Sequence, residues 1–140
     1  MITTLSFVRL HEAAKLPRRP HRWDAGLDLS SVEVWTIGHG ETAIVETGVA
    51  VAIPPGYVGL VQDRSSMGAA GTTRFGGVID SGYSGPIRVV LHNTSREPMR
   101  VEVGQRIAQL VVVECLIAEP TWVDELPASD RGEGGFGSSG

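Results

Sequence analysis

The stretch TGVAVAIPPGYVGLV, residues 47–61, alternates large apolar residues with other residues on both sides of a Pro54-Pro55-Gly56 turn. A period of two is typical of β-strands, because successive side chains point to opposite faces. The alternating large residues are Val49, Val51, Ile53, Val58 and Leu60. Since proline and glycine favour tight turns, this stretch predicts a β-hairpin.

Further strands are expected downstream. GGVIDSGYSGPIRVVLHN, residues 76–93, predicts a second hairpin around a turn that carries Asp80 and Tyr83. MRVEV (99–103) and RIAQLVVV (106–113) also favour strands, because their β-branched residues outweigh the helical tendency of RIAQL. Many short strands at this spacing are typical of a sandwich, jelly roll or barrel. A chain of 140 residues is long enough for one such all-β domain.

Composition limits the partners that the chain can take. Its 16 acidic residues exceed its 12 lysines and arginines, so the formal net charge is -4, and no global positive field exists to hold a nucleic-acid polymer. Cys115 is the single cysteine, which excludes an internal disulfide; we expect it to be buried as a small hydrophobic residue in a reducing compartment. No 18 apolar residues run together, so we expect a cytoplasmic protein without a membrane partner.

Two segments carry candidate phosphate-binding groups. Arg64-Ser65-Ser66 follows a predicted strand, and an arginine fork, two hydroxyls and loop N–H groups can together hold phosphates. Taken alone, however, these residues favour a solvated loop. Gln109 lies in an apolar alternating stretch, where its amide needs either a backbone partner or a ligand.

The turn of the second predicted hairpin carries a candidate catalytic group. Asp80 could simply bond its own backbone, as turn residues commonly do. Alternatively, partly desolvated by the strands, its carboxylate could act as a general base on water. Tyr83 could serve a ligand or pack on the hairpin.

The final segment RGEGGFGSSG, residues 131–140, has the composition of a flexible Gly/Ser tail. It could also act as a flap, with its N–H groups and Arg131 around phosphates and Phe136 stacked on a flat ligand.

The four histidines lack metal-ligand spacing, and no G-x-S-x-G segment occurs, so neither a protein-built zinc site nor a serine nucleophile is expected. Any metal would be magnesium, held mainly by substrate phosphates.

Five segments follow one another along the chain: AGLDLSS, RSSMG, GGVIDSGYSG, GQRIAQL and RGEGGFGSSG. In this order they resemble the five motifs of the homotrimeric dUTPases, the deoxyuridine triphosphate nucleotidohydrolases. The resemblance spans residues 25–140. It implies a jelly-roll-like β-barrel or sandwich subunit at residues 1–130 and a flexible Gly-rich C-terminal arm at residues 131–140. It also implies a homotrimer whose three active sites are each built from more than one chain. The arm would close over a neighbour's site once nucleotide is bound.

The implied reaction is the Mg2+-assisted hydrolysis of dUTP to dUMP and pyrophosphate, which limits uracil in DNA and supplies dUMP for thymidylate synthesis. By this resemblance Asp80 would activate the water that attacks the α-phosphorus, and Asp28 would reach Mg2+ through water. The implied phosphate-binding residues are Arg64, Ser65, Ser66, Gln109, Arg131 and Ser138.

The resemblance also assigns nucleoside recognition. Tyr83 would crowd out a ribose 2′-hydroxyl, Phe136 and the adjacent Gly137 would cap the base, and Arg88 would face the base pocket. Backbone groups of the turn would match uracil and mismatch cytosine. The implied base-reading residues are Gly77, Val78, Ile79 and Asp80.

This chain departs from the family pattern at several positions. Arg74 stands where many dUTPases have an Asn that bonds the uracil edge, and the stretch 65–80 is shortened. We therefore expect the backbone alone to read the base. Pro86 replaces a usual Glu, and Asp63 stands where Pro often precedes the arginine.

Two alternatives remain beside hydrolysis. A dCTP deaminase would share the fold and the RSS and IDxGxxG segments. However, Val90 stands where the catalytic Glu of such an enzyme would fall, so no carboxylate is available to transfer protons during deamination. A nucleotide-binding regulator with weak turnover, or a β-sandwich interaction module, would need neither Asp80 nor the complete tail.

Overall fold

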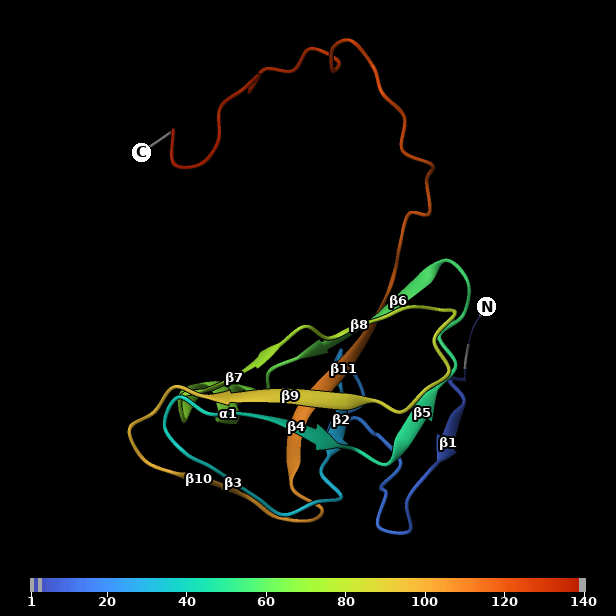
Figure 1. The fold of residues 1–140 in the computed structure, drawn as a ribbon. Coiled ribbons are helices and arrows are strands. Elements are labelled where there is room, and N and C mark those ends of the chain that lie inside the picture. The colour runs from blue at the N-terminus through green and yellow to red at the C-terminus, as the bar shows by residue number, and fades with distance from the viewer. Residues whose placement is uncertain (1, 3, 139–140) are drawn as a thin grey trace.

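The structure, a computed structural model, describes residue 2 and residues 4–138. Within these residues it contains eleven strands and one short helix (Figure 1). The largest sheet has the order β2-β11-β6-β8, and all its neighbours are antiparallel. Its strands are β2 (Leu27–Ser30), β11 (Arg106–Glu114), β6 (Tyr57–Gln62) and β8 (Val78–Ile79).

Three smaller sheets complete the body. They have the orders β4-β9-β7, β1-β5 and β10-β3, and every pairing is antiparallel. Their strands are β4 (Thr42–Glu46), β9 (Arg88–Asn93), β7 (Thr72–Phe75), β1 (Phe7–Arg9), β5 (Val49–Val51), β10 (Met99–Val101) and β3 (Trp35–Ile37). The helix α1 (Ser65–Ala69) joins β6 to β7. The all-β class expected from the sequence is confirmed.

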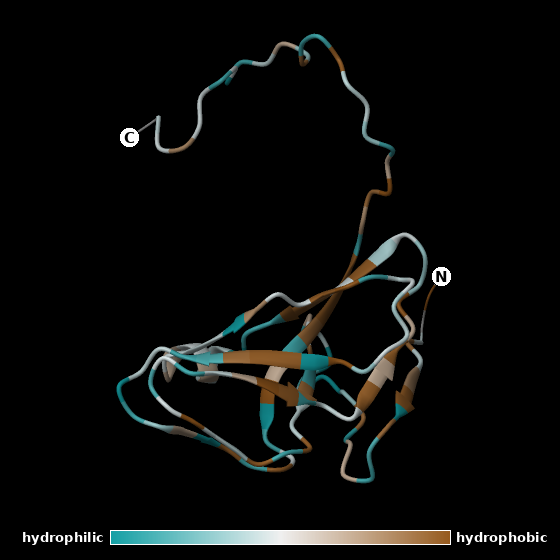
Figure 2. Ribbon diagram, viewed as in Figure 1, coloured by the Kyte–Doolittle hydropathy of each residue, from teal (hydrophilic) through white to brown (hydrophobic). Residues whose placement is uncertain are grey.

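The core lies between the sheets and follows the alternation of the strands. On β9, Val89 and Leu91 are buried while Arg88 is exposed, and on β11 both Ile107 and Leu110 are fully buried. Figure 2 shows hydrophobic residues running along β9 and β11. The strand predicted at residues 106–113 is confirmed, and it is the longest of the described strands.

Both predicted hairpins are wrong, because the strands on either side of each turn belong to different sheets. β5 pairs with β1, whereas β6 pairs with β11 and β8. Likewise β8 pairs with β6, whereas β9 pairs with β4 and β7. The first turn does form, since the amide of Tyr57 donates to the carbonyl of Pro54, but it redirects the chain between layers instead of folding it back.

Beyond β11 the chain leaves the body as an extended segment, the C-terminal arm (residues 115–138), which carries no strand or helix (Figure 1). Large apolar side chains of the arm are exposed: Leu116, Ile117, Trp122, Val123, Leu126 and Phe136. Cys115 at its start is half-buried instead of buried as expected, because the chain leaves the sheet there. No helix in the described part of the chain is long and apolar enough to cross a membrane.

Candidate functional site

Four of the six predicted phosphate-binding residues, Arg64, Ser65, Ser66 and Gln109, gather where β2, β11 and the end of β6 meet. Ser65 and Ser66 lie on the single turn of α1 rather than on the expected loop. Arg64 immediately precedes that turn; its Nε donates to Oδ1 of Asp28 at 3.2 Å, and its Nη1 donates to Oγ of Ser66 at 3.4 Å. Arg106 donates from Nη1 to the other oxygen of Asp28 at 3.3 Å. The Asp28 carboxylate, with its side chain 10% exposed, thus orients two arginines.

Gln109 lies beside Asp28 and Arg64 and lines the same cavity. On β11 it lies opposite Asp28 on one side and Gln62 on the other. Its Nε2 donates to the carbonyl of Asp63 at 2.8 Å, so the amide has the backbone partner that its half-buried position requires. A Cβ at Gly26 would lie 2.0 Å from Oε1 of Gln109, so a larger residue there would displace this amide. A cavity of about 270 Å³ is lined by Pro20, Asp24, Ala25, Gly26, Asp28, Arg64, Ser65 and Gln109.

A second cavity, of about 260 Å³, surrounds the turn after β8. It is lined by Gly77, Val78, Ile79, Asp80, Tyr83, Pro86 and Arg88. The hydroxyl of Tyr83 donates to the carbonyl of Pro86 at 2.7 Å, which fixes the ring at the cavity wall. Asp80 is exposed, so the partial desolvation that the sequence suggested is absent within the single chain.

Arg88 is tied to the neighbouring strand at the rim of the second cavity. Its Nε donates to Oε1 of Glu46 at 2.5 Å. This hydrogen bond and the attraction of the Glu46 charge raise the pKa of the Arg88 guanidinium. Arg88 is therefore positively charged, and Glu46 on β4 orients its guanidinium group.

The structure brings the predicted site residues together in two groups, not one. The cavity around Asp28, Arg64 and Gln109 shares no lining residue with the cavity around Asp80 and Tyr83. The single chain thus forms two distinct cavities from these residues.

The remaining predicted residues lie on the C-terminal arm. Arg131 donates from Nε to the carbonyl of Gly134, and the amide of Ser138 donates to the carbonyl of Gly135 at 3.0 Å. Phe136 is fully exposed and has a positive φ of 51°, which is uncommon for a residue other than glycine. Gly137 beside it has a φ of 84°. These residues contact one another locally, and Arg131, Phe136 and Ser138 are exposed.

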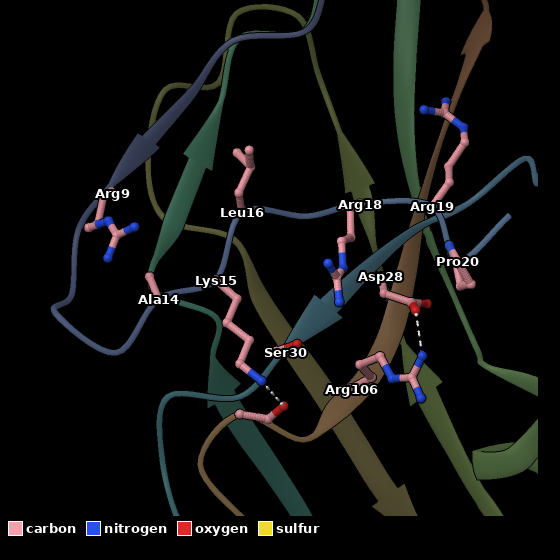
Figure 3. A pocket seen from close by; sticks show the side chains of 11 residues that line it. Arg9, Ala14, Lys15, Leu16, Arg18, Arg19, Pro20, Asp28, Ser30 and Arg106 are labelled. Carbon is pink, nitrogen blue, oxygen red and sulfur yellow. Dashed lines mark hydrogen bonds and ion pairs between the residues drawn. The ribbon is translucent and has the colours of Figure 1, made fainter. Parts of the chain in front are cut away.

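A third cavity, of about 950 Å³, adjoins the Asp28 group and was missed by the sequence reasoning. It shares Pro20 and Asp28 with the smaller cavity. Figure 3 shows the cationic side chains around it: Arg9, Lys15, Arg18, Arg19 and Arg106. The run KLPRRPHR, residues 15–22, was the available signal. These charges create a positive field beside the candidate phosphate-binding residues, in a chain that is acidic as a whole.

The described residues contain no group of three or more His, Cys, Asp or Glu side chains that could hold a metal ion. Asp28 is the one carboxylate in the arginine-rich cavity of Figure 3. A single carboxylate fits a Mg2+ ion that is held mainly by ligand phosphates and reached through water.

Comparisons with known proteins agree on one family. The family model described as dUTPase matches residues 12–140. The deoxyuridine 5'-triphosphate nucleotidohydrolase of Mycobacterium tuberculosis strain H37Rv is 46% identical, covering 100% of this chain and 97% of its own. The dUTPase of Staphylococcus bacteriophage 80alpha with dUpNHpp is 35% identical, with a TM-score of 0.92 over 99% of both chains.

A third comparison concerns a metal. A mutant dUTPase from phage phi11 of S. aureus is 30% identical, with a TM-score of 0.83, covering 88% of this chain and 98% of its own. That structure shows the coordination of a structural Mg(II) ion.

Proposed function

This chain belongs to the dUTPase family and hydrolyses dUTP, and we propose that Asp80 is the base of that reaction. Its carboxylate takes a proton from a water molecule as the water oxygen attacks the α-phosphorus. The bond from this phosphorus to the bridging oxygen breaks, and its electron pair leaves with pyrophosphate, so that dUMP remains. The proposed role is to limit uracil in DNA and to supply dUMP for thymidylate synthesis.

The phosphate chain is proposed to lie over Arg64, Ser65 and Gln109, which line one cavity. Ser66, which accepts a hydrogen bond from Arg64, adds a second hydroxyl. Arg131 and Ser138 are proposed to join from the arm. Mg2+ bound to the phosphates would neutralise their charge, and Asp28 would hold it through water.

The nucleoside is proposed to occupy the cavity at the turn. Backbone groups of residues 77–80 would read uracil, while Tyr83, held by the carbonyl of Pro86, would leave no space for a ribose 2′-hydroxyl. Arg88 would stand at the rim. Phe136 and Gly137 would cap the base, a role that the full exposure of the Phe136 ring supports.

We propose that the active protein is a homotrimer whose sites combine the two cavities from different copies. The separation of the two groups of site residues supports this assembly. The exposed apolar side chains of the arm support it as well, because large exposed apolar surface is typical of sites that bind another protein chain. Residues 1–130 would form the β domain and residues 131–140 the closing flap. We propose the cytoplasm as its compartment because the lone Cys115 is free.

One observation carries the proposal: Asp80 and Tyr83 line a single cavity with the turn backbone, in a chain that matches the family over residues 12–140. The test is a panel of dUTP, dCTP, dTTP and UTP with and without Mg2+, scored for pyrophosphate and for ammonia. We expect pyrophosphate from dUTP above all, in a Mg2+-assisted reaction. Ammonia from dCTP would indicate deamination instead, and a wild-type rate equal to that of Asp80→Asn would indicate a binding protein.

A further inference from the structure

Arg74 joins the two larger sheets at the point where the chain crosses between them. It lies on β7, opposite Leu91 of β9. Its Nη2 donates to Oε1 of Gln62 at 2.8 Å, and Gln62 ends β6 in the other sheet. Its Nη1 donates to the carbonyl of Gly76 at 3.0 Å. The guanidinium therefore holds the chain just before the turn that lines the nucleoside cavity.

The crossing itself has an unusual backbone. Gly76 and Gly77 have positive φ values of 67° and 107°, which favour glycine. The carbonyl of Gly77 accepts a hydrogen bond from the amide of Val61 at 2.7 Å. Two consecutive carbonyls are thus fixed, one by the side chain of Arg74 and the next by the backbone of β6.

The environment of Arg74 favours a role other than simple stabilisation. Both of its hydrogen-bond acceptors, a carbonyl and an amide oxygen, are neutral. Its Nε is the one buried side-chain nitrogen or oxygen without a hydrogen-bond partner in the described residues. Burying an unsatisfied donor of a charged group costs stability. An apolar side chain would avoid that cost but could not hold Gly76.

We propose that Arg74 is a positioning residue that fixes the turn of residues 77–80 for base recognition. It does not line the nucleoside cavity, so it acts through Gly76 and not by touching the nucleotide. This inference rests on the proposed function, in which the backbone of the turn reads uracil. Because hydrogen-bond recognition depends on geometry, a loosened turn should discriminate less well between dUTP and dCTP.

The test compares Arg74→Met, which keeps the aliphatic stem but removes the donors, with Arg74→Lys, which keeps a charge and a donor. Arg100→Met is the matched control, because Arg100 is exposed on β10 and pairs with the exposed Glu102. We expect Arg74→Met to lower kcat/KM for dUTP by about tenfold or more and that for dCTP by less. Arg74→Lys should recover part of the loss, and Arg100→Met should match the wild type.

Amide hydrogen exchange of the nucleotide-free protein gives a readout independent of catalysis. Arg74→Met should exchange faster in the segment 75–82 and unchanged in β9 and β11. Wild-type kinetics and exchange in Arg74→Met would overturn the inference. So would equal losses for dUTP and dCTP with faster exchange throughout, which would mark general destabilisation. If the wild type released no pyrophosphate from dUTP, the proposed function would fail, while the exchange experiment would still test the Arg74 contacts.

Discussion

The Asp80 carboxylate is the single group whose change should separate nucleotide binding from chemistry. Asp80→Asn keeps the shape of the side chain and removes the base. We expect turnover of dUTP to fall by about a hundredfold or more, while the affinity for a non-hydrolysable dUTP analogue stays within about threefold. Pyrophosphate release and calorimetric titration measure the two quantities. Asp124→Asn, on the exposed arm, is the control; a similar loss of turnover there would contradict the assignment.

Gly77 tests the backbone geometry of the same turn. Its φ is 107°, and a Cβ would lie 2.9 Å from the carbonyl oxygen of Val61, which is a backbone atom that cannot rotate away. We expect Gly77→Ala to lower the free energy of unfolding by about 2 kcal/mol or more.

Gly82 in the same turn provides the matched comparison, because a Cβ there would meet nothing within 4 Å. Gly82→Ala should stay within about 0.5 kcal/mol of the wild type. Urea unfolding at one fixed protein concentration compares the variants. Equal stability of both variants would mean that the turn tolerates side chains at both positions.

At the scale of elements, the end of the C-terminal arm, after Asp130, should be separable from the body. Its last described residues, 131–138, bond mainly to one another and not to the sheets. Truncation after Asp130 should therefore leave the unfolding temperature nearly unchanged. It should lower turnover by about a hundredfold, because donors proposed to stabilise the transition state are removed.

Circular dichroism and pyrophosphate release measure these two effects. Phe136→Ala, which keeps the phosphate-binding groups of the arm, should have an intermediate effect on turnover. A truncated protein with full activity would refute the flap.

The strands illustrate what a sequence pattern can and cannot predict. Alternation marked β9 and β11 correctly, because each buries one face in the core. It failed for the partners of β5 and β8, which pair with β1 and β6 across long sequence separations. A turn signal such as Pro54-Pro55-Gly56 shows that the chain changes direction, but not in which sheet it continues. Pairing between distant strands is decided by packing of the whole core.

At the scale of the whole molecule, the candidate site shows the same limit. Its motifs were recognisable because each needs particular residue types, such as the arginine and hydroxyls of residues 64–66. The order of the motifs along the chain does not predict that their residues line two separate cavities. The basic residues of the segment 15–22 went unnoticed because cations spaced along a loop also occur on solvated surfaces. Only the fold places Arg18 beside Asp28 and Arg106.

The division into two cavities leads to a prediction for the assembly. If each site takes Asp80 from one copy and Arg64 from another, two inactive variants should restore activity when they share a trimer. Asp80→Asn and Arg64→Ala, co-expressed with different affinity tags and purified through both, give trimers that contain each variant. In a cyclic trimer of two kinds of subunit, about one site in three then combines an intact Asp80 with an intact Arg64.

We therefore expect the doubly purified hybrid to release pyrophosphate at about a third of the wild-type rate. A hybrid of Asp80→Asn with Asp80→Ala is the control and should stay inactive, because no arrangement supplies the base. Activity no higher than that of the separate variants would place Asp80 and Arg64 of one chain in one site. That outcome would require the chain to bring its two cavities together by itself, although they share no lining residue.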